Sequence, residues 1–467
     1  MIYELPHVPT TAPISLKFTV VGGGLAGLAT AYALRRAGHN VLVVEKSDGT
    51  ARSPGGLRSS PNMTKVLAKW GLMREVLQLA TELDNTNFLS AHTGEMLGIM
   101  SAKLIQEIQK DSDPNSSFLL VTQGEVHELM YNVARREGVT FRFNSAVVEA
   151  DIQSGVVTLE DGEEIEADLI VGADGCHSGL RRYVENTEEK MSKSENVGIL
   201  DFTGTLTNED VEKDPRLLEH KSDLDMYFGN GFYVSVHFHS APEKRRFSVV
   251  IAHPYEDDVP IQYEDWKPLE KSSDFNFDLE QLAPWLRKLI SLATHKWGRI
   301  FTVKETLQNV NKSRLVLVGE AFHAISPGSF LSGAMSFEDA HTLGCLFSAI
   351  QSKSQINRFL TAYDEIRLPR SSFVHHKDAY HRGVATLPPG PYRDTRDAHL
   401  RMSLQQGMGD AEMAEIYGED IRMFTYDPGV DTGAWWNQYG SMVLDPESRT
   451  RRESIMEVQI ASSIAIS

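Results

Sequence analysis

Cysteine is almost absent from this chain, which has two, Cys176 and Cys345, among 467 residues. Two thiols cannot form a disulfide framework, so the composition indicates a reducing compartment, and we expect a cytoplasmic protein. The N-terminal residues also lack the layout of a secretory signal, in which a charged start precedes an apolar run. No stretch of the chain approaches the roughly 18 uncharged apolar residues of a membrane span, so we expect no span.

Basic residues are also in deficit, since 46 Lys and Arg stand against 64 Asp and Glu, which gives a net charge of −18. Nucleic-acid binding requires clustered Lys and Arg for phosphate contacts, so we expect no nucleic-acid partner. No group of Cys and His has the spacing of a structural zinc site, and we expect no bound metal. Apolar residues make up 41% of the chain, which excludes disorder as its main state.

A strand–glycine–helix pattern begins near the N-terminus. The apolar run 18–21 is typical of a buried strand, and the helical pattern 25–37 follows it after three glycines. A second buried strand, 41–44, ends at Glu45. This order predicts a β-α-β unit with parallel strands and a right-handed crossover.

The glycines of this unit fit the G-x-G-x-x-G pattern of dinucleotide-binding proteins at Gly22, Gly24 and Gly27. They allow a tight turn and the close approach of a pyrophosphate to backbone N–H groups at a helix N-terminus. Glu45 lies where an acidic residue accepts hydrogen bonds from ribose hydroxyls. An ordinary glycine-rich turn would explain the glycines but not the acidic residue. The pattern itself does not distinguish NAD from FAD.

Further elements follow along the chain. Alternating apolar residues between about 187 and 310 indicate a largely antiparallel sheet. Residues 386–443 are rich in Pro, Gly and Asp, and no element is assigned there. Buried strands are expected at 169–171 and 315–318, and helices at 62–79, 123–138, 335–350 and 355–381.

Four segments resemble motifs of the single-component, group A, FAD-dependent aromatic hydroxylases, which include salicylate hydroxylase-like proteins and para-hydroxybenzoate hydroxylase. Asp168–Arg182 resembles the Asp-Gly motif of that family, and Val318–Ala340 resembles its third motif. Leu360–Arg370 resembles its helical Tyr-x3-Arg-x-Pro-Arg segment, and Pro54–Leu72 the loop and helix after the ribose-binding acid. The resemblance therefore extends over nearly the whole chain.

The resemblance implies an α/β fold in which a Rossmann-type FAD-binding domain, a parallel sheet with helices, is interleaved with an α+β substrate domain on a largely antiparallel sheet. The FAD-binding domain is expected to be discontinuous, and residues 386–467 to form a C-terminal extension. The expected segments are 15–77, 115–186 and 310–385 for the FAD-binding domain, and 78–114 and 187–309 for the substrate domain.

The function implied is an FAD-dependent monooxygenase that hydroxylates a phenolic aromatic through a flavin C4a-hydroperoxide. NADPH or NADH is then a transient co-substrate beside O2 and a small aromatic substrate, and the chain is a monomer or homodimer. One alternative is a non-enzymatic carrier on the same fold, like the Rab GDP-dissociation inhibitors. Another is a flavin halogenase, although its Trp-x-Trp-x-Ile-Pro pattern is absent.

The resemblance also assigns FAD contacts, with two departures from the family pattern. Glu320 stands where the family has the aspartate that holds the ribityl chain, and Gln123 stands where many relatives have arginine. The loop 327–332 replaces the usual Pro-x-x-Gly-Gln-Gly, and its Phe330 and Leu331 are bulky. The expected FAD-binding residues are Gly22, Gly24, Gly27, Glu45, Gln123, Asp174, Gly175, Glu320, Ser332, Gly333 and Ala334.

The substrate side carries fewer signals. Arg58 lies in the loop expected near the isoalloxazine, where its charge would stabilise an anionic flavin or substrate. His237 and His239 share one face of an expected strand, with Tyr227 and Tyr233 near in sequence. A base on this face would assist by deprotonating a phenol, although a packed sheet residue is the simpler reading of each. Arg58, His237 and Pro327 are the residues predicted to act at the reaction site.

One position on the substrate side differs from salicylate-type relatives, which often carry arginine in the strand 199–204. Thr203 in this strand cannot form a charge-assisted fork to a carboxylate. A larger, neutral phenol is therefore a reasonable rival to salicylate as the substrate.

Overall fold

The fold comes from a computed structural model of the chain. The residues that the structure describes are 10–50, 55–103, 105, 116–185, 197–214, 217, 223–238, 246–254, 266–269, 277–302, 307–404, 418 and 422–444. Among them, no helix is both long enough and apolar enough to cross a membrane.

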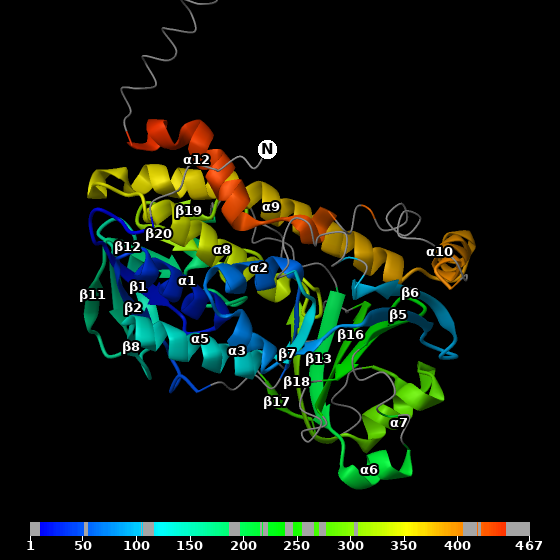
Figure 1. The fold of residues 1–467 in the computed structure, drawn as a ribbon. Coiled ribbons are helices and arrows are strands. Elements are labelled where there is room, and N and C mark those ends of the chain that lie inside the picture. Colours follow the sequence, from blue (N-terminus) through cyan, green and yellow to red (C-terminus); the bar gives the residue numbers. More distant parts are fainter. Residues whose placement is uncertain are drawn as a thin grey trace, which may run out of the picture.

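A six-stranded sheet forms one end of the molecule (Figure 1). Its central strand β1 pairs in parallel with β2 on one side and with β12 on the other. Helix α1, Leu25–Arg36, connects β1 to β2, as the glycine pattern predicts. In order across the sheet the strands are β19 (Asn311–Lys312), β20 (Leu315–Leu317), β12 (Leu169–Gly172), β1 (Lys17–Val21), β2 (Asn40–Val44) and β8 (Thr140–Arg142).

Helices cover this sheet and hold its functional loops in place. Helix α1 packs against α5 (Gln123–Glu137) and α8 (Ser332–Phe347). The N-terminus of α5 is fixed by a capping box between Thr122 and Glu125. The long α9 (Ile356–Ala385) lies outside α8, and α12 (Pro428–Leu444) crosses α9 (Figure 1).

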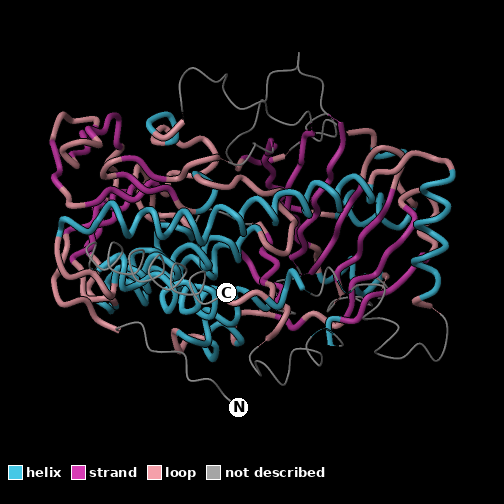
Figure 2. Tube along the Cα trace, turned by 90° about the horizontal axis from the view of Figure 1, so that it is seen from above, coloured by secondary structure: helices cyan, strands magenta, loops and turns pink. Residues whose placement is uncertain are grey.

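An eight-stranded sheet forms the other end of the molecule. Its strands pair antiparallel except β14 and β5, which are parallel. Figure 2 shows strands at both ends of an elongated molecule, with helices between them. The order is β17 (Lys267–Pro268), β18 (Thr294–Thr302), β13 (Val197–Thr205), β16 (Arg246–Pro254), β15 (Tyr233–Phe238), β14 (Leu224–Phe228), β5 (Asn85–Ser90) and β6 (Met96–Ser101).

Smaller elements complete the two ends. A short sheet lies between them and brings Gly55, in the loop before its strand β3 (Gly56–Ser59), beside the start of α5. Helices α6 (Asn208–Lys213) and α7 (Pro284–Leu292) accompany the large sheet (Figure 1). The short sheet contains β3 (Gly56–Ser59), β7 (Leu119–Thr122) and β4 (Thr81–Glu82), and a second one contains β9 (Val147–Asp151), β10 (Val156–Leu159) and β11 (Glu164–Glu166).

The predicted fold class, a parallel sheet with helices and a second, largely antiparallel sheet, is confirmed. The domain boundaries given above stay a prediction. The single helix expected at 62–79 is wrong: α2 (Pro61–Lys69) and α3 (Met73–Leu77) are separated at Gly71, whose φ of +76° ends a right-handed helix.

The C-terminal region also differs from expectation. Helix α9 continues four residues beyond the expected His381, to Ala385. Helices α10 (Pro391–Met402) and α12 lie within the segment where no element was assigned. Pro391 occupies the first turn of α10, where proline costs no backbone hydrogen bond, so its presence there is compatible with a helix.

Candidate active site

A groove of about 220 Å³ opens beside the glycine turn that follows β1. Segments far apart in the sequence form its walls, and each wall carries one of the sequence motifs. Its described lining includes Gly24 from the glycine turn, Gln123 from the start of α5, Gly175 from the loop after β12, Glu320 from the loop after β20, and Ser332 and Gly333 from the start of α8.

The structure gives a different reason for the presence of glycine at each of the three predicted positions. Gly22 has a φ of +108°, and a Cβ there would lie 2.3 Å from the carbonyl oxygen of Ala173. A Cβ at Gly27 would lie 1.9 Å from the carbonyl oxygen of Gly22. A Cβ at Gly24 would meet no protein atom within 4 Å. The fold thus requires Gly22 and Gly27, whereas Gly24 leaves space open toward the groove.

Glu45 is held at the end of β2 by two backbone N–H groups. Gly23 donates to Oε2 at 2.7 Å and Ser47 donates to Oε1 at 2.8 Å. Burial opposes ionisation, but these hydrogen bonds outweigh it, and the pKa of Glu45 lies below its usual value. The carboxylate is therefore ionised at neutral pH and keeps lone pairs for further donors.

The Asp-Gly segment and Gln123 close another side of the groove. Asp174 Oδ2 accepts a hydrogen bond from Leu180 N–H at 3.2 Å, while Oδ1 is buried with no partner among the described residues. Gly175 lines the groove with a φ of +82°. The backbone N–H of Gln123 donates to Gly55 at 2.9 Å, which ties the start of α5 to the loop before β3.

Glu320 faces the groove from the opposite wall. Its carboxylate makes no hydrogen bond or ion pair with the described residues, and the side chain is half-buried. The preceding Gly319 has a φ of +61°, and a Cβ there would lie 2.4 Å from Cβ of Ala26. This close approach sets the loop against α1 and presents the Glu320 carboxylate to the groove.

The start of α8 borders the groove as the third motif predicts, with one exception. Ser332 and Gly333 line it, and the first backbone N–H groups of a helix lack intrahelical partners. Ala334 is fully buried and is not among the lining residues. Pro327 and Gly328 line the groove just before the helix.

Four buried charges tie α8 to α9. Arg367 donates to Asp339 at 2.8 Å and to Glu338 at 2.9 Å, and Arg370 donates to Glu338 at 2.9 Å. Asp339 also accepts the Gly319 N–H at 2.9 Å. The Tyr-x3-Arg-x-Pro-Arg segment thus supports the loop that carries Glu320.

A second, larger cavity of about 640 Å³ meets the groove at Gly328, which lines both. We call it the aromatic cavity, because rings and aliphatic side chains dominate its walls. Phe330 is one of them and packs on Phe118 and Phe424, with ring centroids 5.3 and 5.9 Å apart. Its described apolar lining is Phe88, Met100, Met226, Phe228, Tyr233, Phe330, Val384, Ala385, Leu387, Tyr392, Leu400, Met423 and Phe424.

Arg58 lies where the two cavities meet. It lines the aromatic cavity and is 2% exposed. Its Nη2 donates to Ser235 Oγ at 2.6 Å and its Nη1 donates to the Gly328 carbonyl, while Nε is buried without a partner among the described residues. Burial lowers the pKa of Arg58 to about 10, so the group is cationic at neutral pH. A buried cation without a carboxylate in contact favours an anionic or electron-rich partner.

The other residues predicted on the substrate side do not all line a cavity. His237 is 2% exposed, packs behind Gly56 and lines neither the groove nor the aromatic cavity. Tyr233 does line the aromatic cavity, and Tyr227 does not. His239 lies outside the described residues. Thr203 is buried and donates to the Phe247 carbonyl at 2.9 Å, so its hydroxyl is not directed to a ligand.

Sequence reasoning missed an ion pair in the groove. Asp201 on β13 and Arg299 on β18 both line it, with Nε and Oδ2 3.3 Å apart. Burial raises the pKa of Asp201, and Arg299 opposes that effect. The two residues are 98 positions apart and meet only because their strands pair, so no local sequence pattern predicts this ion pair.

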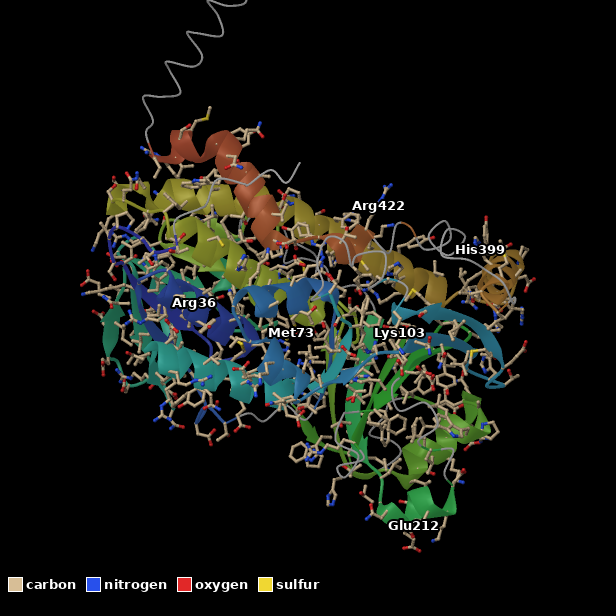
Figure 3. The ribbon with its side chains drawn as sticks, in the orientation of Figure 1. Arg36, Met73, Lys103, Glu212, His399 and Arg422 are labelled. Atoms are coloured by element: carbon tan, nitrogen blue, oxygen red, sulfur yellow. The ribbon has the colours of Figure 1, made fainter. Side chains whose placement is uncertain are left out.

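The ends of α9 and α10 were also missed as cavity walls. Asp378 and Arg382 of α9 and Arg396 and His399 of α10 line the aromatic cavity. Figure 3 shows His399 on α10, and this helix packs against β6. Arg396 is paired with Asp397 and lies over the Phe228 ring at 4.6 Å.

Residues 16–377 match the family described as FAD binding domain. Hispidin-3-hydroxylase of Neonothopanus nambi is 29% identical over 377 residues, which cover 77% of this chain and 87% of that protein. The structure of Klebsiella pneumoniae HpxO complexed with FAD and uric acid is similar with a TM-score of 0.69 at 20% identity, covering 88% of this chain and 96% of that one. A salicylate hydroxylase–substrate complex gives a TM-score of 0.69 at 17% identity, covering 90% and 97%. The likeness to these two structures is one of fold.

Proposed function

We propose that this chain, which belongs to the FAD-binding domain family, is an NAD(P)H- and O2-dependent monooxygenase that hydroxylates a phenolic aromatic. The membership confirms the predicted family resemblance and the predicted cofactor, FAD. The relative hispidin-3-hydroxylase bears the name of a hydroxylase, which supports this class of reaction. No relative named above is a halogenase, and that alternative has no support.

The observation that carries the proposal is the junction of the groove with the aromatic cavity at Gly328. The residues present fit FAD: space is open in front of Gly24, Glu45 is ionised, and Glu320 makes no hydrogen bond with the described residues. Glu45 would bind the adenosine ribose, and Glu320 the ribityl hydroxyls. FAD bound there supplies the reduction of O2 and the transfer of one oxygen atom.

The substrate, in this proposal, occupies the aromatic cavity with its reacting ring toward Gly328. Rings such as Phe88 and Phe228 exclude water and stack on an aromatic ligand. Arg58 would stabilise negative charge that develops on a phenol oxygen or on the flavin during the reaction. Thr203 offers no charge, its hydroxyl is engaged and it lines neither cavity, so position 203 provides no carboxylate clamp. The substrate that we propose is therefore a neutral phenol, with Arg58 beside its electron-rich ring.

The electron donor would be NADPH or NADH, bound transiently. A reducing compartment such as the cytoplasm suits Cys176 and Cys345, which form no disulfide. The chain would act as a monomer or homodimer.

The alternative from another class is a non-enzymatic carrier on the same fold. The colour of the purified protein and its NAD(P)H oxidation with and without a panel of phenols separate the two. The proposal expects a yellow protein whose NAD(P)H oxidation is stimulated by at least one phenol, with an oxygenated product. A colourless protein, or equal oxidation rates with and without every phenol, would support the carrier.

A further inference from the structure

Three polar side chains form a cluster at the wall of the aromatic cavity, which two of them line. Ser326 Oγ donates to Asp378 Oδ2 at 2.6 Å. Arg382 Nη1 donates to Ser326 Oγ at 2.7 Å and also forms an ion pair with Asp378 Oδ2, one helical turn away on α9. Ser326 directly precedes Pro327, which lines the groove. The cluster therefore lies next to the junction of the two cavities.

Only one of the two carboxylate oxygens of Asp378 takes part in this cluster. Both Ser326 and Arg382 bind Oδ2, and Oδ1 makes no hydrogen bond with the described residues. Asp378 lines the aromatic cavity with a side chain that is 10% exposed, and it is the only carboxylate among the described lining residues. Its second oxygen is thus an acceptor without a hydrogen bond to the described residues, at the wall of a cavity whose other described charged side chains are cationic arginines.

Among the described charged side chains that line this cavity, Asp378 is the one that only accepts hydrogen bonds when it is ionised. Arg58, Arg382 and Arg396 line the same cavity and are donors only. Burial raises the pKa of Tyr233 to about 12, so its phenol keeps its proton at neutral pH. His381 and His399 also line the cavity, and so do hydroxyl groups such as that of Thr86, whose Oγ1 is buried without a partner among the described residues. A neutral hydroxyl is a weaker acceptor than an ionised carboxylate.

We propose that Asp378 accepts a hydrogen bond from a hydroxyl group of the substrate and so selects aromatics with a free hydroxyl over their ethers. The inference rests on the proposed function and names the feature by which that site recognises its substrate. Ser326 and Arg382 are positioning residues here, because they fix Oδ2 and leave Oδ1 directed to the ligand.

The variant Asp378→Asn makes the test sharp. Ser326 and Arg382 both donate to Oδ2, so the amide oxygen of Asn will take that place. The amide nitrogen then stands where Oδ1 stood, and an acceptor facing the cavity becomes a donor. Asp394→Asn is the matched control, since Asp394 is an exposed carboxylate on α10 that lines neither cavity.

The probes are 2-naphthol and its methyl ether, 2-methoxynaphthalene, and the dissociation constants come from the change in flavin absorbance or fluorescence. We expect wild type and Asp394→Asn to bind 2-naphthol about ten- to a hundred-fold more tightly than the ether, as for a hydrogen bond to a charged group. In Asp378→Asn the ratio is expected to fall to about one, with FAD content unchanged.

Measurements on the wild type alone can overturn the inference. Equal affinity for both probes, or no binding of either probe, would do so. A ratio that persists in Asp378→Asn overturns it as well. FAD content and phenol-stimulated NAD(P)H oxidation are measured on the same samples. If these fail in the wild type, the proposed function fails; if only the ratio fails, the assignment of Asp378 alone is wrong.

Discussion

The backbone N–H of Gly23 donates a 2.7 Å hydrogen bond to Glu45 Oε2 and ties the turn after β1 to the end of β2. The same contact orients the carboxylate and places the glycine turn beside it. Two elements of the dinucleotide pattern, 22 residues apart, are therefore one unit in the fold. Gly24, next in the turn, faces open space.

Gly24→Val is expected to leave the fold intact and to weaken FAD binding. A Cβ at Gly24 meets no protein atom within 4 Å, so the substitution creates no clash inside the protein. The branched side chain instead occupies space that a pyrophosphate needs close to the backbone. We expect an FAD dissociation constant raised at least about tenfold, equivalent to roughly 1.4 kcal/mol. Gly179→Val, at an exposed glycine that also has open space, is the control.

Normal FAD content in folded Gly24→Val would contradict this placement of the pyrophosphate. Circular dichroism and thermal unfolding establish that both variants are folded.

Glu320→Ala is expected to weaken FAD without unfolding the protein. Glu320 makes no hydrogen bond or ion pair with the described residues, so the fold loses little. The ribityl hydroxyls would lose an acceptor, at roughly 1–3 kcal/mol, or about five- to a hundred-fold in the dissociation constant. Glu320→Asp restores the family residue and should stay near wild type. Equal affinity of Glu320→Ala and wild type for FAD would show that the side chain does not contact the cofactor.

Arg58→Met is expected to impair turnover more than folding. Arg58→Met loses the hydrogen bonds to Ser235 and Gly328, but it also removes a buried charge that has no carboxylate in contact, and the two effects on stability oppose each other. Loss of its charge at the junction of the two cavities should lower kcat/KM for a phenol by roughly ten- to a hundred-fold. Steady-state kinetics and thermal unfolding measure the two effects, with exposed Arg74→Met as the control. Unchanged kcat/KM would remove Arg58 from the reaction site.

His39 should make the protein sensitive to mild acid. It accepts a hydrogen bond from Leu16 N–H on Nδ1 at 3.2 Å, and its Nε2 lies 3.1 Å from the Phe347 carbonyl. Burial lowers its pKa to about 4. Between pH 6.5 and 4 the unfolded chain binds a proton that the folded chain does not, so stability falls as pH falls through this window. At pH 5 the loss is roughly 1–2 kcal/mol.

Thermal unfolding between pH 7 and pH 5 tests this effect. His39→Gln keeps a donor and an acceptor but does not titrate, so its midpoint should fall less with pH than that of wild type. His376→Gln, at an exposed position, should follow wild type. Identical pH profiles for His39→Gln and wild type would contradict the assignment.

The sequence predicted the parts of the site that depend on local geometry. Local backbone geometry explains each of these parts. They are the glycines at a strand–helix turn, the acid at the end of the next strand and the motif at the start of a helix. Gly27, for example, is required because a Cβ there would lie 1.9 Å from the carbonyl oxygen of Gly22, within the same unit. Such contacts lie within one β-α-β unit and leave a readable spacing.

The substrate side could not be predicted in the same way. Asp201 and Arg299 meet because β13 and β18 pair, and Asp378 reaches Ser326 across 52 residues. His237 lies on the face of β15 that the period of two predicts, but Gly56 packs against it and keeps it from both cavities. Which face of a strand meets a ligand is decided by tertiary packing, which one sequence does not display.

Isotope labelling tests the central claim most directly. The purified protein is given NADPH or NADH, a phenol that stimulates its oxidation, and ¹⁸O2, and the product is analysed by mass spectrometry. The account predicts one ¹⁸O atom in each hydroxylated product molecule. NAD(P)H oxidation that yields only peroxide with every phenol, or a product whose new oxygen comes from water, would contradict it.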